Sequence, residues 1–245
     1  MKADPQVQRR LLDLQAIDTA LAQLAHRRRS LPERAELEAL ARELSALEDE
    51  RVRAQVAVDD LDRDIARLEK DVDQVRARKS KDEDRLAVGT GPARELEALQ
   101  HELVSLNRRQ SDLEDAELEL MEQRETAQAV LDGIERRLTE ARERRIVTGQ
   151  RRDDSLAEIG REEEFKRSAR QPLANDLPAD LVQLYDRIRG DTGLGAALLA
   201  AGRCGGCRLD ISGADLSRIR KADPAEVVRC EDCRRIMIRT NESGL

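Results

Sequence analysis

The chain has 245 residues, of which 39% are charged and only 1% are aromatic. Phe165 and Tyr185 are its only aromatic side chains, and its abundance of Ala, Leu, Glu and Arg is typical of long helices and coiled coils. The net charge of −7 argues against general binding to polyanions. No apolar run approaches the roughly 20 residues that span a bilayer, and the polar N-terminus does not resemble a signal peptide. We therefore expect a cytoplasmic protein that does not enter membranes.

Two stretches of apolar residues at 3-4 spacing predict the main architecture. The first begins at Leu37 and the second at Leu96, and each continues for roughly seven heptads, beyond the three or four that identify a coiled coil. Because the repeat holds to sevens, we expect a left-handed supercoil. The predicted core positions are Leu37, Leu40, Leu44, Leu47, Arg51, Ala54, Val58, Leu61, Ile65, Leu68, Val72, Val75, Lys79, Asp82, Leu86, and Leu96, Leu99, Leu103, Leu106, Gln110, Leu113, Glu117, Leu120, Arg124, Ala127, Leu131, Ile134, Leu138, Ala141.

A turn between the two stretches predicts that they fold back on each other. In Val88-Gly-Thr-Gly-Pro92, the glycines can end one helix and the proline suits the first turn of the next. We therefore expect an antiparallel coiled-coil hairpin over residues 1–170, with its tip near 88–92. Each helix would have on the order of 80 residues and a length of about 120 Å. Matching the core layers favours Leu44 near Ile134, and a register one heptad away is the alternative.

A proline and a glycine predict that both helices of the hairpin are interrupted at the same level. Pro32 interrupts the first helix and Gly149 the second, and the favoured register places them within about a turn of each other. Such a paired interruption would form a bend or a flexible joint. Beyond it the repeat resumes, and we expect Leu14, Ile17, Leu21 and Leu24 to face Leu156, Ile159 and Phe165.

Residues 171–190 form a predicted connector. The segment Gln171–Pro178 contains two prolines and is rich in turn-forming residues. Ala179–Arg189 then has the pattern of a short amphipathic helix, which Gly190 would end. Its apolar face should pack between the base of the hairpin and the C-terminal domain. The residues of this face are Leu181, Leu184, Tyr185 and Ile188.

Four cysteines, the only ones in the chain, indicate a metal site in residues 191–245. They form two Cys-x-x-Cys pairs, and each pair can place two sulfurs on one ion, as in a tetrathiolate zinc ribbon. Because four thiolates leave no open coordination position, we expect one structural Zn²⁺. The predicted ligands are Cys204, Cys207, Cys230 and Cys233.

Other interpretations of these cysteines are weaker. Two disulfides would suit a secreted protein, a redox Cys-Gly-Gly-Cys motif would need a surrounding βαβ pattern, and the two turn-like pairs favour zinc over an iron–sulfur cluster. Gly205 and Gly206 suit a turn that uses backbone conformations closed to other residues. Around the ligands we expect a short helix at residues 211–219 and strands at 226–229 and 235–240.

The predicted ribbon is rich in cations that could contact nucleic-acid phosphates. Acidic residues, among them Asp215, Glu226, Glu231 and Asp232, are interleaved with them, and the ribbon has no aromatic residue to stack on a base. A solvated surface of mixed charge is therefore the alternative interpretation. The candidate contacts are Arg218, Arg220, Lys221, Arg229, Arg234, Arg235 and Arg239.

No motif in the chain indicates catalysis. His101-Glu102 begins like a zinc-protease motif, but Ser105 stands where the second histidine would be. Two short glycine motifs, at residues 89–91 and 193–195, lack the lysine of a phosphate-binding loop and the length of a dinucleotide fingerprint. A coiled coil also offers no deep pocket, so we expect a protein that is not an enzyme.

Three segments carry motifs that belong together. They are the tip, Val88–Glu102, with Glu-Leu-Glu-Ala-Leu after the turn; the connector, Leu177–Arg189; and the ribbon from Gly202 to Ile236. With these motifs the chain resembles a bacterial family, the C4-type zinc-ribbon coiled-coil proteins. The resemblance implies a long helical hairpin with a ribbon at its base, and a strand at Gly193–Ala201, where composition alone suggests a helix. It also implies relatives tied to flagellar regulation and to type III secretion.

The leading hypothesis is a cytoplasmic adaptor or scaffold that binds zinc and mediates protein–protein interactions. The main alternative is a regulator that binds RNA or DNA through the basic ribbon. A third is a rod whose zinc only closes the hairpin. The sequence leaves open the identity of the partners and whether the chain forms a homo-oligomer.

Overall fold

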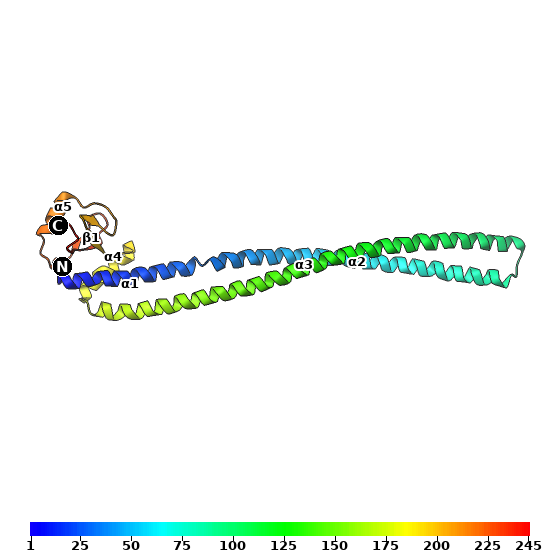
Figure 1. Cartoon of the computed structure of the whole chain (residues 1–245), viewed down its shortest axis with the longest axis horizontal. Coiled ribbons are helices and arrows are strands. Elements are labelled where there is room, and N and C mark those ends of the chain that lie inside the picture. The colour runs from blue at the N-terminus through cyan, green and yellow to red at the C-terminus, as the bar shows by residue number, and fades with distance from the viewer. The chain divides into compact units, whose positions relative to one another are not determined.

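The computed structural model describes all residues, 1–245, and they form two compact units. Unit 1 comprises Met1–Arg34 and Gln150–Leu245, and unit 2 comprises Ala35–Gly149. The fold is mostly α-helical with a small strand-containing region near the C-terminus, as predicted (Figure 1). No helix combines the length and the apolar character needed to cross a membrane. The elements are α1 (Pro5–Arg29), α2 (Pro32–Val88), α3 (Ala93–Asn175), α4 (Ala179–Thr192), β1 (Ala196–Ala200), β2 (Arg203–Cys204), α5 (Gly213–Lys221), β3 (Val228–Arg229) and β4 (Ile236–Ile238).

Unit 2 is an antiparallel coiled-coil hairpin made by α2 and α3. The two helices are joined by the four residues Gly89–Pro92, and Gly89 has a φ of 63°, which glycine adopts without strain. Every core position predicted from the heptad pattern is buried or half-buried. The heptad pattern therefore identified the core of the hairpin correctly.

The favoured register of the hairpin is wrong, however. Glu43 accepts a hydrogen bond from Arg144 at 2.6 Å, and Glu50 accepts one from Arg137 at 3.2 Å. These ion pairs place residues of α2 opposite residues of α3 that lie about one heptad further from the tip than expected. The alternative register therefore fits better, because interhelical ion pairs at the flanks of the core help to select among registers that heptads alone leave equivalent.

The first helix is interrupted as predicted, but the second is not. α1 ends at Arg29 and α2 begins at Pro32, in keeping with the missing N–H of proline. α3 continues through Gly149, so the predicted break there is wrong. A glycine inside a helix costs only about 1 kcal/mol, which packing along a helix of 83 residues offsets. α3 also contains Pro172 and extends past residue 170 to Asn175.

The strands of unit 1 form one sheet in the order β2-β1-β4-β3. β1 pairs in parallel with β4 and antiparallel with β2, while β3 pairs antiparallel with β4. The strand β1 confirms the expectation that came from the family resemblance. The N-terminus also joins this region, because Ala3 N–H donates to the carbonyl of Ala225 at 2.8 Å and Val227 N–H donates to that of Met1 at 3.1 Å.

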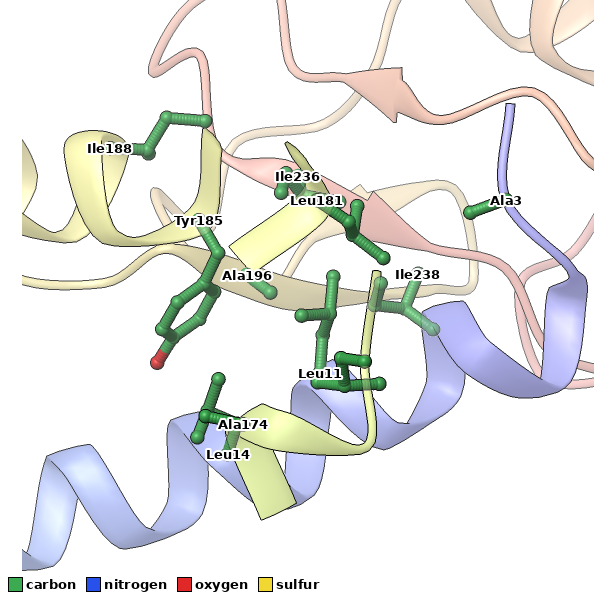
Figure 2. Packing of buried hydrophobic residues seen from close by; sticks show 11 residues of the cluster. Ala3, Leu11, Leu14, Ala174, Leu181, Tyr185, Ile188, Ala196, Ile236 and Ile238 are labelled. Atoms are coloured by element: carbon green, nitrogen blue, oxygen red, sulfur yellow. The ribbon is translucent and has the colours of Figure 1, made fainter. Parts of the chain in front are cut away.

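Strand β4 separates two apolar clusters in unit 1. Ile236 and Ile238 belong to a cluster with Leu11 and Leu14 of α1 (Figure 2). Met237 belongs to the other cluster, which contains the cysteines. The expected alternation along this strand is thus present, although both of its faces are buried. The apolar face of α4 lies in the first cluster, as predicted, and contributes Leu181, Tyr185 and Ile188. α4 continues past Gly190 to Thr192, and the residue that caps it is Gly193, with a φ of 80°.

One predicted core residue of unit 1 is misplaced. Phe165 is 69% exposed, whereas Ile159 is fully buried in a cluster with Leu24 and Leu31. Continuing the heptad spacing from Ile159 leads to Glu163, which is 5% exposed and lies 3.5 Å from Arg28. The position of a residue in the heptad repeat therefore predicts its burial better here than the aromatic character of Phe165 does.

Candidate functional site

The four cysteines converge on one point in unit 1. Their sulfur atoms all lie within 4.8 Å of one another. Cys204 and Cys233 have sulfurs 3.8 Å apart, and Cys207 and Cys230 have sulfurs 3.9 Å apart. A tetrahedron with Zn–S bonds of about 2.3 Å has an edge of about 3.8 Å. The cluster therefore fits the coordination geometry of Zn²⁺.

The two Cys-x-x-Cys loops are built in the same way. The N–H of the residue four places after the first cysteine donates to that cysteine's carbonyl, from Arg208 to Cys204 at 2.7 Å and from Arg234 to Cys230 at 2.9 Å. The N–H of the first cysteine donates to the carbonyl five places later, at 3.1 Å in one loop and 3.0 Å in the other. Both arginines have positive φ, 65° and 60°. The two loops thus form matching halves of one site.

The glycines of the first loop are required by close packing, because a side chain at either position would clash with a neighbour. Neither Gly205 nor Gly206 has positive φ, so the conformational argument made from the sequence is wrong for them. A Cβ on Gly205 would lie 2.7 Å from the carbonyl oxygen of Leu198, and one on Gly206 would lie 2.5 Å from the side chain of Arg235. Gly205 N–H donates to the same carbonyl at 2.8 Å. The first loop is therefore pressed against β1.

The pKa values of the thiols differ within the cluster. Burial raises the pKa of the Cys204 thiol and raises that of Cys230 to about 12. Burial also acts to raise the pKa of Cys233, but hydrogen bonds from Arg235 N–H and from the other thiols outweigh it and lower that pKa to about 7. Burial therefore disfavours the thiolate form of Cys204 and Cys230 when no cation is bound. A zinc ion displaces the thiol protons, since it binds thiolates.

Comparison with known proteins identifies the chain. Residues 14–193 match the model of the CT398-like coiled coil hairpin domain, and residues 203–237 match that of the C4-type zinc ribbon domain. The chain belongs to the CT398-like family. It is 40% identical over 239 residues to an uncharacterised protein of Mycobacterium tuberculosis, covering 98% of each chain, and 33% identical to one of Mycobacterium leprae, covering 87% of this chain and 92% of the other.

Two solved structures are similar to this CT398-like chain. One, of a protein from Mycobacterium smegmatis, has a TM-score of 0.84 and 36% identity, with 98% of this chain and all of the other covered. The other is CT398 from Chlamydia trachomatis, with a TM-score of 0.64 and 18% identity, covering 95% of this chain and 97% of that one. The second likeness concerns the fold alone. The expected membership in a family of zinc-ribbon coiled-coil proteins is confirmed.

Three of the seven predicted nucleic-acid contacts in this CT398-like chain are engaged within the protein. Arg218 lies 2.6 Å from Glu231 and 3.3 Å from Asp215. Arg235 donates to the carbonyl of Thr192 at 2.8 Å. Arg239 donates to five backbone carbonyls between Ile219 and Glu226, of which the shortest contact is 2.6 Å, to Glu226 itself. These side chains stabilise the ribbon.

The other four predicted contacts remain candidates for binding. They are exposed, and none takes part in an ion pair or a side-chain hydrogen bond with another residue of the chain. Two lie at the end of α5 and two flank the second cysteine pair. They are Arg220, Lys221, Arg229 and Arg234.

The structure adds two features that the sequence patterns of the CT398-like chain did not reveal. One is Arg9 of α1, which lines the same hollow as Arg220 although the two are far apart in sequence. The other is Asp18 of α1, which is buried and bound to Arg170 and Tyr185. The heptad pattern contains no signal that would single out Arg9. The burial of Asp18 depends on Arg170, which is distant in sequence, so the pattern of α1 alone does not predict it.

Proposed function

We propose that the chain is a non-enzymatic adaptor of the cytoplasm, which binds one Zn²⁺ through Cys204, Cys207, Cys230 and Cys233 and presents its surfaces to protein partners. The observation that carries the proposal is the closed four-sulfur cluster. Four thiolates saturate a tetrahedral Zn²⁺ and leave no position for a substrate or a reactive water. The ion would hold the two loops of the ribbon in place, so that the ribbon serves as a binding module.

The hairpin supports the same role. Its two helices offer a surface rich in charged side chains, and no sequence motif on it indicates small-molecule chemistry. Among the charges, Val104, Leu118 and Met121 of α3 are 70%, 59% and 45% exposed. Apolar side chains on the outer face of a helix are contact points of the kind that partner proteins use.

Affinity capture with matched variants tests the adaptor function. The intact protein would be cross-linked in its native cells beside a Cys204→Ser/Cys230→Ser variant and a Val104→Lys/Leu118→Lys variant, and the captured proteins would be reconstituted with the purified chain. We expect at least one protein that binds the intact chain in a fixed stoichiometry and is lost with one of the variants. If no protein meets these conditions, the adaptor function is wrong.

Nucleic-acid binding is the second candidate, and the four exposed, unpaired cations of the ribbon favour it. Titrating the full-length, zinc-loaded protein with RNA and with duplex DNA at two salt concentrations tests it. Each phosphate contact that is lost should weaken binding and reduce its dependence on salt. We therefore expect Arg229→Glu/Arg234→Glu to do both. Absence of binding by the intact protein at low salt would exclude this function.

A further inference from the structure

A hollow in unit 1 is lined by positively charged side chains, and neither the zinc site nor the hairpin accounts for them. It has a volume of about 320 Å³ and lies between the start of α1, the end of α5 and the segment after β4. Three arginines line it, and no aspartate or glutamate is among its lining residues. The arginines are Arg9, Arg220 and Arg239.

Two of these arginines are unpaired. Arg9 and Arg220 are exposed, and neither makes an ion pair or a hydrogen bond through its side chain. By contrast, Arg10 of the same helix as Arg9 lies 2.8 Å from Asp176, and Arg218 of the same helix as Arg220 lies 2.6 Å from Glu231.

The position of Arg9 places its positive charge near a helix end that is not favourable for cations. Arg9 lies in the second turn of α1, close to the end of the helix that carries partial positive charge. The first turn of α1 has no acidic residue, and the side chain of Asp4, which precedes it, accepts a hydrogen bond from Gln6 N–H. Arg220 is in the last turn of α5, where a cation is favourable, so the helix termini alone do not account for Arg9.

The rest of the hollow indicates which kind of anion would fit. Pro5, Ala222 and Pro224 contribute apolar surface, while Thr240 and Asn241 contribute polar groups. No aromatic side chain lines the hollow, so a nucleotide base would find no ring on which to stack. Arg220 and Arg9 can each bind a carboxylate through two parallel hydrogen bonds.

We propose that this hollow binds a short acidic peptide segment of a protein partner. Carboxylates of the segment pair with Arg9 and Arg220, and an apolar side chain between them packs on Pro5, Ala222 and Pro224. Arg239, fixed by its five carbonyl partners, adds positive potential without moving. This inference rests on the proposed adaptor function and assigns the chemistry of one of its contacts.

A selection from a random peptide library, displayed on phage, tests the proposal with the full-length zinc-loaded protein. We expect the enriched peptides to combine aspartate or glutamate with aliphatic residues. A synthetic peptide of the enriched sequence should bind at least about tenfold more weakly to Arg9→Glu/Arg220→Glu, because two attractive charge pairs become repulsive. The control is Arg229→Glu/Arg234→Glu, which changes the net charge of the same unit equally and should bind the peptide as the intact protein does.

The outcomes separate this proposal from the adaptor function. Zinc content and circular dichroism must match among the variants, since both pairs of arginines are exposed and free of partners. The proposal is wrong if no peptide is enriched, if the enriched peptides lack acidic residues, if both double variants weaken binding equally, or if single-stranded RNA displaces the peptide. A protein captured from cells equally by the intact protein and by Arg9→Glu/Arg220→Glu would leave the adaptor function standing and exclude this hollow as its contact.

Discussion

Tyr185 of α4 donates a hydrogen bond to Asp18 of α1 at 2.8 Å, at the centre of a buried polar network in unit 1. Asp18 also accepts two hydrogen bonds from Arg170 of α3, at 2.7 and 3.1 Å. Next to them, the side-chain oxygen of Gln15 lies 3.2 Å from the Tyr185 hydroxyl and accepts from Gly195 N–H at 2.7 Å. The network therefore connects α1, α3 and α4 with the start of β1.

The first prediction concerns the charge of Asp18. Its side chain is 1% exposed, so Asp18→Ala leaves the partly buried Arg170 without its main partner and should cost about 3 kcal/mol. Asp176→Ala is the matched control, because the pair of Asp176 with Arg10 is exposed and should cost less than about 1 kcal/mol. Hydrogen exchange of the α4 amides measures both effects. Equal protection in the two variants would mean that the network contributes little to stability.

The second prediction concerns alkaline pH. Burial, and then the hydrogen bond to Asp18, raise the pKa of Tyr185 well above its ordinary value of 10.0. In the unfolded chain the phenol ionises near pH 10, whereas in the folded chain it stays neutral, so folding stability is retained below pH 10 and falls as the pH rises above it. Because Tyr185 is the only tyrosine, the ultraviolet absorbance of tyrosinate reports on it alone.

Two variants sharpen this titration. Tyr185→Phe should lose about 1 kcal/mol at neutral pH through the missing hydrogen bond, and should not show the tyrosine-linked loss of stability above pH 10. Asp18→Asn removes the negative charge beside the phenol and should bring the titration closer to the ordinary range. A tyrosine that ionises at its ordinary pKa in the folded intact protein would show that the ring is not buried as described.

The third prediction compares two glycines of unit 1. A Cβ on Gly195 would lie 2.5 Å from the ring of Tyr185 and 2.6 Å from its carbonyl oxygen. Since Tyr185 is fully buried and cannot yield, Gly195→Ala should destabilise unit 1 by about 1–3 kcal/mol. Gly190 lies inside α4, and a Cβ there would have no atom within 4 Å, so Gly190→Ala should stabilise the helix by about 0.5–1 kcal/mol. Thermal unfolding should therefore shift in opposite directions for the two substitutions.

The fourth prediction tests the corrected assignment of the core of α3. Ile159→Ala removes a fully buried side chain and should cost about 2–4 kcal/mol. Phe165→Ala should change stability by no more than about 0.5 kcal/mol, because that ring is 69% exposed. Chemical denaturation, with hydrogen exchange of the α1 amides as the probe, measures the change in stability for both variants. A larger loss with Phe165→Ala than with Ile159→Ala would restore the assignment made from the sequence.

The fifth prediction concerns metal removal. Chelation of zinc, or Cys204→Ser, should unfold the two cysteine loops and expose the cluster that contains Leu199, Ile219 and Met237. Helical circular dichroism should decrease only slightly, because most helical residues belong to α2 and α3. Metal analysis should give one zinc per intact chain and none in the variant. Loss of most helicity on chelation would show that the helices depend on the zinc site for their stability.

Much of the fold follows from two periodic signals in the sequence. Every core position that the heptads predicted for the hairpin is buried or half-buried, because a 3-4 spacing has a single geometric meaning on a helix. The cysteine spacing identified the four-sulfur cluster for a similar reason, since two short loops of that length can share one ion. Both signals depend on residues that are close together in the sequence, and their spacing directly determines which side chains share a helix face or a metal ion.

The errors arise where the outcome depends on distant residues. Gly149 was expected to break α3, but helix continuity there depends on packing along the whole helix. The register depended on pairs such as Glu43 with Arg144, which no single-helix pattern reveals. Arg235 and Arg239 were assigned to a binding surface because their carbonyl partners are separated from them in sequence.

The pairing of Met1 and Ala3 with residues 225–227 has a consequence for how the chain folds. Unit 1 draws on both ends of the sequence, with all of residues 35–149 between them. Contacts across so long a loop carry an entropic cost and form slowly when nothing shortens the path. The hairpin contacts nearest the tip are far more local, so zipping from Gly89–Pro92 outward would draw α1 and the end of α3 together. On this account unit 2 acts as a template for the pairing of the N-terminus with residues 225–227.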